Sequence, residues 1–202
     1  CNWHNWKFDL KTGECFVGGD NVRAYPTKIE NGTIIVDLSP PSPEEITKEI
    51  TKGLKIAFEY KDYGRIAREL ARYSFNDLDP VIGLRKSILW SFDKFEWGAT
   101  HCYAAAAEWL KKFHEFSDRE DKLICLTEAI DHIAFDSLRH KTYAYTDESL
   151  DWDEKKFLVA VENEDEKMAV GVLNGGLKAG MRFKDFQEGL AKSSLSHYAN
   201  FG

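Results

Sequence analysis

The chain has 202 residues and a mass of 23.2 kDa, enough for one ordinary domain or two small ones. Its 27 Lys and Arg residues are outnumbered by 34 Asp and Glu residues, for a formal net charge of −7, which argues against a nucleic-acid partner. Hydrophobic residues make up 43% and charged residues 30%, a balance that excludes a disordered chain. No apolar run is long enough to span a bilayer, so we also expect no membrane partner.

The first 38 residues are predicted to form β-strands. Apolar and polar side chains alternate over residues 5–10, and a second strand is expected over residues 22–29. Pro26 interrupts that second strand and places it at an edge or a bend. Asn31-Gly32 is a strong hairpin signal, because both residues tolerate the positive φ of a type I′ turn. A β-branched strand is expected to follow over residues 33–38.

A proline-rich linker, Ser39-Pro40-Pro41-Ser42-Pro43, separates this region from the rest. Ser42 and Glu45 have the spacing of a helix capping box, with Pro43 in the first turn. We therefore predict two domains, residues 1–41 and residues 42–202.

Beyond the linker the hydrophobic pattern takes a helical period. Ser117 and Glu120 predict a capping box at the start of the fifth helix. Residues 141–153 are expected to be a polar loop. The predicted helices cover residues 43–58, 62–73, 80–92, 99–116, 117–140, 154–161, 165–175 and 183–194. The fold class is therefore α+β, with a truncated antiparallel β piece followed by an all-α bundle or helical-repeat domain.

The helical part also shows signs of an internal repeat. Asp62 matches Asp165 and Leu70 matches Leu173 at the same offset along the chain. A second copy would stop at Gly202, just before the equivalent of His101. We therefore expect the helical domain to be truncated at its C-terminus, and the chain to be a fragment cut at both ends.

The residues with the clearest chemistry are at the N-terminus. Cys1-Asn2-Trp3-His4 is a Cys-x-x-His pair, and it is followed by the segment Asn5 to Glu14 and by Val22-Arg23-Ala24-Tyr25-Pro26. These segments resemble the second half of a Rieske [2Fe–2S] domain of the ring-hydroxylating-ferredoxin and nitrite-reductase-small-subunit type. The resemblance covers residues 1 to about 38. It implies that Cys1 binds one iron of the cluster through sulfur and that His4 binds the other through a ring nitrogen.

In that family a Cys-x-His pair supplies the other two ligands, and this chain does not contain one. Neither Cys15, Cys102 nor Cys125 is followed two residues later by His. The missing pair is therefore expected upstream of Cys1. Whole ring-hydroxylating oxygenase subunits carry an Asp-x-x-His-x-x-x-x-His motif that binds a mononuclear iron. Here Asp131 directly precedes His132, so this chain is not expected to be such a subunit. A structural zinc site would need a second ligand pair at close spacing. None follows Cys1 and His4, so zinc fits this motif less well than a cluster does.

A second group of polar residues lies on the predicted fourth and fifth helices. His101 and Glu108 share one face, and Glu128 and His132 share another. If the two helices form an antiparallel hairpin, His101 lies level with His132 and Glu108 with Glu128. These four side chains would then suit a second metal or an acid–base site. The alternative is a solvated polar face, which needs no site to explain it.

The helical domain also distantly resembles the questin-oxidase-like helical proteins. The residues in support are Gly98-Ala99-Thr100-His101 and Asp131-His132, and they imply no catalytic assignment. Four cysteines without close pairing suggest a reducing, cytoplasmic compartment.

Together these features predict Rieske-type cluster binding and one-electron transfer in an oxidoreductase or oxygenase-like system. The redox partner would be a reductase or an oxygenase component. The alternative is a redox-sensing or structural cluster attached to a helical module that binds a ligand or a partner without catalysis.

Overall fold

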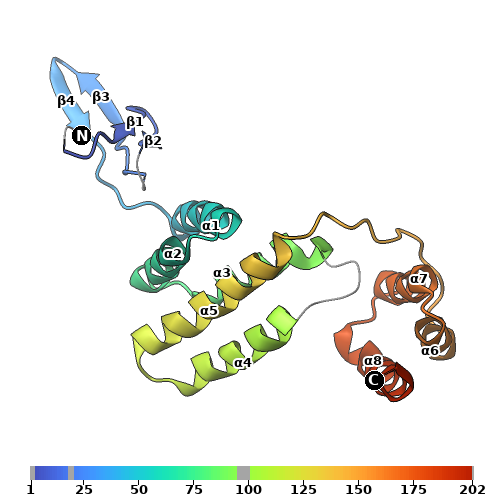
Figure 1. Ribbon diagram of the computed structural model, residues 1–202. Coiled ribbons are helices and arrows are strands. Elements are labelled where there is room, and N and C mark those ends of the chain that lie inside the picture. The colour runs from blue at the N-terminus through green and yellow to red at the C-terminus, as the bar shows by residue number, and fades with distance from the viewer. Residues whose placement is uncertain (1–2, 18–20, 95–100, 202) are drawn as a thin grey trace. The chain divides into compact units, whose positions relative to one another are not determined.

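The computed structural model describes residues 3–17, 21–94 and 101–201, and the side chains of the last helix as far as residue 196 (Figure 1). Contacts between residues divide the chain into two compact units, Cys1–Glu49 and Ile50–Gly202. The first unit holds the strands and the second is helical, so the fold is α+β with a helical bulk. Among the described helices, none has both the length and the apolar character needed to cross a bilayer.

The first unit contains two antiparallel hairpins. The first pairs β1 (Lys7–Phe8) with β2 (Cys15–Val17). The second pairs β3 (Thr27–Glu30) with β4 (Thr33–Val36). The predicted turn of the second hairpin is confirmed.

Asn31 and Gly32 close that second hairpin with φ values of 52° and 76°. Both angles are positive, as a type I′ turn requires. The strand predicted over residues 22–29 begins only at Thr27, which is a correction to the sequence prediction. The backbone N–H of Val22 donates instead to the carbonyl of Gly13, and Pro26 has no N–H to offer a strand partner.

The linker ends where the sequence predicts, at the first helix α1 (Pro43–Tyr60). The backbone N–H of Ser42 donates to a Glu45 carboxylate oxygen at 2.8 Å, and the N–H of Glu45 donates to Ser42 Oγ at 3.2 Å. This reciprocal pair is a capping box, and Pro43 occupies the first helical position. The start of the helical region is therefore set by local chemistry.

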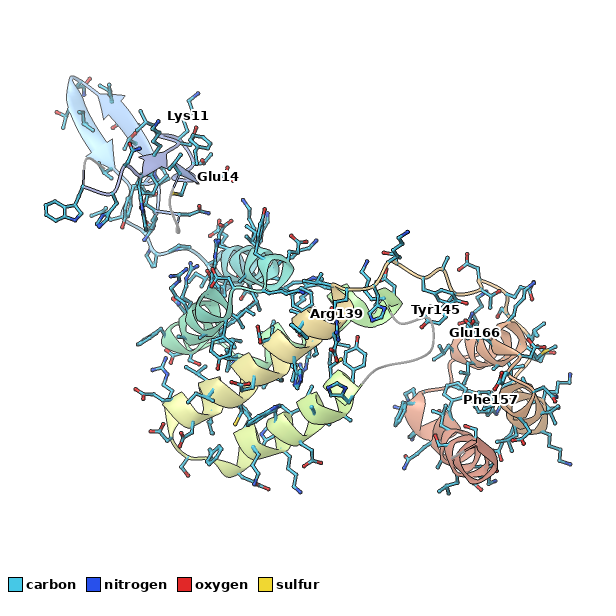
Figure 2. The ribbon with its side chains drawn as sticks, in the orientation of Figure 1. Lys11, Glu14, Arg139, Tyr145, Phe157 and Glu166 are labelled. Atoms are coloured by element: carbon cyan, nitrogen blue, oxygen red, sulfur yellow. The ribbon has the colours of Figure 1, made fainter. Side chains whose placement is uncertain are left out.

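In the second unit, α5 packs against α2, α3 and α4, while α6 packs against α7 and α8 (Figure 1). Buried apolar residues such as Leu54, Leu70 and Ile130 form the core of the first group, and Phe157 and Val172 belong to a core cluster of the second (Figure 2). The helices that follow α1 are α2 (Tyr63–Phe75), α3 (Val81–Ser91), α4 (His101–Glu115), α5 (Arg119–Ser137), α6 (Glu154–Glu162), α7 (Glu166–Lys178) and α8 (Phe183–Phe201), with a short 3₁₀ turn η1 (Phe92–Lys94) after α3.

The capping box predicted at Ser117 is wrong. The cap of α5 is Asp118, whose carboxylate accepts hydrogen bonds from the backbone N–H groups of Glu120 and Asp121 at 2.8 and 3.1 Å. An aspartate is as good an N-cap as a serine, and here it lies one residue nearer the helix. The helix ends at Ser137, earlier than the predicted position near His140.

The internal repeat is visible in the turns between helices. Asp62 and Asp165 each cap a 13-residue helix, and each accepts the backbone N–H three residues later at 3.0 Å. The residues just before them, Lys61 and Glu164, have positive φ values of 54° and 55°. The N–H groups of all four residues donate to carbonyls of the preceding helix in the same pattern. Two segments with the same offset therefore share one turn geometry.

The next turn repeats as well. Asp77 and Gly180 are equivalent positions, and their φ values are 55° and 87°. The backbone N–H groups of residues 76–78 and 179–181 donate to the preceding helix in the same order. We call α1–α3 the first repeat and α6–α8 the second repeat. Equivalent buried pairs are Leu54 and Phe157, Ala57 and Ala160, Ile66 and Ala169, and Tyr73 and Gly176.

At one buried position the repeats differ in charge, since Glu69 of the first corresponds to Val172 of the second. The Glu69 side chain is 2% exposed, and Arg72 donates to it at 2.7 Å. A Cβ atom on Gly53 would lie 2.6 Å from a Glu69 carboxylate oxygen, so the glycine in α1 makes room for it. Desolvation raises the pKa of Glu69, although Arg72 acts in the opposite direction.

This raised pKa predicts a dependence of stability on pH. The folded chain holds the Glu69 proton more tightly than the unfolded chain does. The resulting contribution is full below the ordinary glutamate pKa, about 4.3, and is lost as pH rises through the raised pKa. We expect the free energy of unfolding to fall with rising pH in this window. Glu69→Gln should flatten that slope, as measured by urea unfolding at a series of pH values. Parallel slopes in both proteins would contradict this expectation.

The predicted loop over residues 141–153 has no helix or strand, and its last part lies against α7. Figure 2 shows Tyr145 in this segment and Glu166 at the start of α7. The backbone N–H of Leu150 donates to the carbonyl of Gly171 at 2.9 Å. The Asn174 amide donates to carbonyls at positions 146 and 148, each at 3.0 Å. Hydrogen bonds from one backbone N–H and from the Asn174 side chain therefore hold this segment against α7.

Gly175 makes this close approach possible, since a Cβ there would lie 1.5 Å from the carbonyl oxygen of Leu150. We expect Gly175→Ala to lower the free energy of unfolding by about 1–3 kcal/mol through overpacking. Gly171→Ala is the matched control, because its Cβ would meet only side-chain atoms, the nearest of them in Leu150 at 3.4 Å. Chemical denaturation followed by circular dichroism measures both. Equal stability of the two variants would contradict this expectation, because it would show that the segment around Leu150 can move away from α7 without loss of stability.

Candidate functional site

His4 lies on a turn just before β1, and its side chain is exposed. The next residue, Asn5, has a φ of 56°, which turns the chain sharply. The imidazole lies between two indoles, with ring centroids 6.2 Å from Trp3 and 6.2 Å from Trp6. Within the described residues, no hydrogen bond engages a ring nitrogen of His4. The imidazole is therefore available as a ligand, with two indoles nearby.

Cys1, the other residue of the predicted pair, lies outside the described residues. The described cysteines are all free thiols, and two of them are buried in helices: Cys102 in α4 and Cys125 in α5. Burial is the main cause that raises the pKa of the Cys125 thiol, with Asp121 adding to it. A raised pKa keeps the thiol protonated, whereas metal ligation needs the thiolate. Cys15 lies on β2 and is partly buried.

The structure brings together two of the four residues predicted on the helical hairpin. α4 and α5 run antiparallel, and the rings of His101 and His132 meet edge to face with centroids 5.3 Å apart. The predicted level pairing of these two histidines is therefore observed. His101 is at the first position of α4, and its side chain is 72% exposed.

A third residue joins this pair that the sequence reasoning missed. Asp136 of α5 is buried, and its carboxylate oxygen Oδ2 lies 3.9 Å from His101 Nε2. Its other oxygen accepts a hydrogen bond from Arg139, which lies near the end of α5 (Figure 2). Asp136 lies four residues after His132, on the same helix face. This four-residue spacing could have indicated a shared site in the sequence, but the same spacing also occurs on ordinary solvent-exposed polar faces of helices.

Glu128 and Glu108 face different partners and do not converge. Glu128 accepts a hydrogen bond from the Tyr63 hydroxyl of α2 at 2.6 Å. This bond is the main cause that raises the pKa of Tyr63 to about 12. Glu108 is exposed on α4, where its charge acts on Lys112 one turn away. Each carboxylate thus interacts with a different side chain, Glu128 with Tyr63 and Glu108 with Lys112.

Asp131 lies close to Glu128 and His132. Burial is the main cause that raises the pKa of its carboxyl group, and the negative charge of Glu128 adds to it, whereas His132 acts in the opposite direction. Over residues 3–17, 21–94 and 101–201, no group of three or more His, Cys, Asp or Glu side chains is placed to hold a metal ion. The second metal predicted for this hairpin thus stays a prediction.

Comparisons with protein-family models, with curated proteins and with solved structures find no match to this chain. The class of protein must therefore be argued from the residues and contacts described above. Two arrangements carry chemistry: the indole-flanked His4 of the first unit, and the His101–His132 pair of the second.

Proposed function

We propose that the first unit is the second half of a Rieske-type [2Fe–2S] domain and that the protein carries out one-electron transfer in an oxidoreductase or oxygenase-like system. The observation that carries the proposal is the setting of His4. Its imidazole is exposed on a tight turn, between two indoles, at Cys-x-x-His spacing from Cys1. Thiolate and imidazole are the two ligand types of a Rieske centre.

In this proposal Cys1 holds one iron through its sulfur, and His4 holds the other through a ring nitrogen. The bound cluster supplies a one-electron redox centre whose potential is raised by the neutral imidazole ligands. In the cluster-loaded domain, Trp3 and Trp6 would shield the cluster from water. A drier shell lowers the local dielectric and so tunes the potential as well.

The second hairpin gives further support. Every residue of β3 and β4 is exposed, including Ile29 at 74% and Ile34 at 69%. Apolar strands are stable when other elements bury them. The further strands of a Rieske domain, which carry the Cys-x-His pair, are the cover we propose for this hairpin.

The test begins with the coding region ahead of Cys1. We expect a Cys-x-His pair there, in a strand-rich context. The polypeptide encoded by that region together with this chain is then purified without oxygen, and its iron and acid-labile sulfide are measured. We expect about two of each per chain. Absence of the pair, or a protein without sulfide, would contradict the proposal.

The alternative function, in which the helical unit binds a ligand or a second metal, is favoured by the His101–His132 contact. Imidazole and carboxylate are groups that bind cations or transfer protons, and the buried Asp136 carboxylate lies 3.9 Å from His101. The test replaces both histidines with alanine in the cluster-loaded protein and measures bound metal. His114, an exposed residue further along α4, is the matched control. Unchanged metal content beyond the cluster would end the metal form of this alternative.

A further inference from the structure

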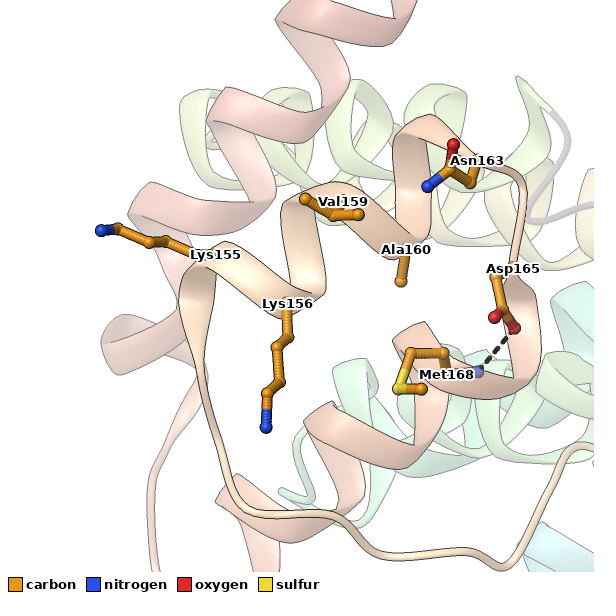
Figure 3. Close-up of a pocket in the computed structure, with 7 residues that line it drawn as sticks. All are labelled: Lys155, Lys156, Val159, Ala160, Asn163, Asp165 and Met168. Atoms are coloured by element: carbon orange, nitrogen blue, oxygen red, sulfur yellow. Dashed lines mark hydrogen bonds between the residues drawn. The ribbon is translucent and has the colours of Figure 1, made fainter.

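An open cavity lies between α6 and α7 of the second repeat (Figure 3). Its volume is about 410 Å³, which lies within the range of small-molecule sites. Val159 and Ala160 of α6 line it together with Met168 of α7, and Ala160 and Met168 lie opposite each other in Figure 3. Lys155 and Lys156 extend from α6 at its rim.

The apolar lining of this cavity is left in contact with water. The side chains of Val159 and Met168 are 60% and 39% exposed. Both lie beside buried residues of the repeat, Ala160 and Ala169. Apolar surface of this kind gains free energy when an apolar group covers it. The cavity therefore favours an occupant with an apolar body.

The two lysines at the rim are unpaired. Among the residues that the structure describes, neither Lys155 nor Lys156 forms an ion pair with a carboxylate. Asp165 also lines the cavity, but its carboxylate is engaged as the cap of α7 and accepts the backbone N–H of Met168 at 3.0 Å (Figure 3). Lys192 of α8, by contrast, is paired with Glu154 at 2.8 Å. An anionic group is thus the complement of this rim.

The first repeat differs at a position that lines the cavity in the second repeat. The residue equivalent to Met168 is Arg65, whose long side chain is only 19% exposed, with its Nε atom 4.0 Å from the Glu69 carboxylate. In the second repeat a shorter Met168 and an apolar Val172 replace this buried pair. The position that lines the cavity in the second repeat is thus held by a member of a mostly buried ion pair in the first repeat and by an apolar side chain in the second.

We propose that the cavity between α6 and α7 binds a small organic acid with an apolar body. The apolar body lies on Val159 and Met168, and the carboxylate pairs at the rim with the ammonium group of Lys155 or of Lys156, which extend from α6 in different directions (Figure 3). The binding is reversible and forms no covalent bond. This site is independent of the cluster proposed for the first unit.

The test titrates octanoate into the full chain by isothermal titration calorimetry, with 1-octanol as the uncharged analogue of the same length. We expect saturable binding of one octanoate, and binding of octanol that is at least about tenfold weaker. The double variant Lys155→Glu/Lys156→Glu should weaken octanoate binding at least about tenfold. Lys178→Glu/Lys184→Glu is the matched control, since it makes the same charge change at exposed positions away from the cavity. That control should bind octanoate within about twofold of the unaltered chain.

Val159→Gln keeps a mostly exposed position and removes the apolar contact, so it should weaken octanoate binding several-fold. Circular dichroism checks that every variant keeps its helices. The proposal is overturned if octanoate shows no saturable binding or if octanol binds equally well. It is also overturned if the two lysine pairs lose affinity to the same extent, because the anion then responds only to net charge.

Discussion

Replacing His4 with alanine is expected to abolish the cluster of the protein that carries the full ligand set. The imidazole is one of the four ligands in the proposed cluster, and the nearest described aromatic neighbours, Trp3 and Trp6, are not iron ligands. A [2Fe–2S] centre with three ligands exposes one iron to water and is lost. We expect iron and acid-labile sulfide to fall to background levels, while the helical circular dichroism stays unchanged. The helices belong to the second unit, apart from the start of α1.

His114→Ala is the control for this experiment. That residue is also an exposed histidine with an aromatic neighbour, because its ring lies 5.2 Å from the Phe113 ring, but it is on α4. Its replacement should leave iron and sulfide at the level of the unaltered protein. Retention of a full cluster in His4→Ala would mean that the imidazole is not a ligand, and the Rieske assignment would then fail.

The second large effect is expected at Phe186 of α8. Its side chain is 3% exposed and meets the Trp152 ring edge to face at 4.8 Å. Truncation of a buried phenylalanine to alanine costs about 3–5 kcal/mol, because it removes apolar contacts and leaves a cavity. Phe186→Ala should therefore destabilise the second repeat by about this amount.

Gly176 of α7 is the partner that tests this packing. A Cβ atom there would lie 2.6 Å from the Phe186 ring, so Gly176→Ala alone should cost about 1–3 kcal/mol by overpacking. In the double variant the ring is gone, and only the flexible Met181 side chain, whose sulfur would lie 3.1 Å from the added Cβ, has to shift. We expect the double variant to be no less stable than Phe186→Ala alone. Urea unfolding of the four proteins gives this coupling, and strictly additive costs would show that the two residues do not touch.

Local chemistry made much of the fold predictable. The Ser42–Glu45 capping box and the Asn31-Gly32 turn act within a few residues, so their sequence signals are direct. The sequence does not decide between neighbouring N-cap residues as directly, because Ser117 and Asp118 are both good caps for α5. Strand limits also depended on long-range partners, as Val22 shows by bonding to Gly13 instead of extending a strand.

The candidate sites depended more on contacts between helices. Counting along a hairpin was enough to place His101 beside His132. It was not enough to identify Asp136, because burial of that carboxylate depends on how α5 packs. The buried Glu69 was equally hidden, since its room comes from Gly53 on another helix. The repeat could be predicted from two matched pairs, but its shared turns needed backbone angles.

The reduction potential of the purified protein tests the central claim most directly. Titration of the cluster signal against redox mediators gives the midpoint. A cluster ligated by two Cys and two His should have a midpoint between about −150 and +300 mV, and His4→Cys should lower it toward the all-cysteine range. A midpoint near −400 mV in the unaltered protein, the value typical of four-cysteine ferredoxins, would contradict the account.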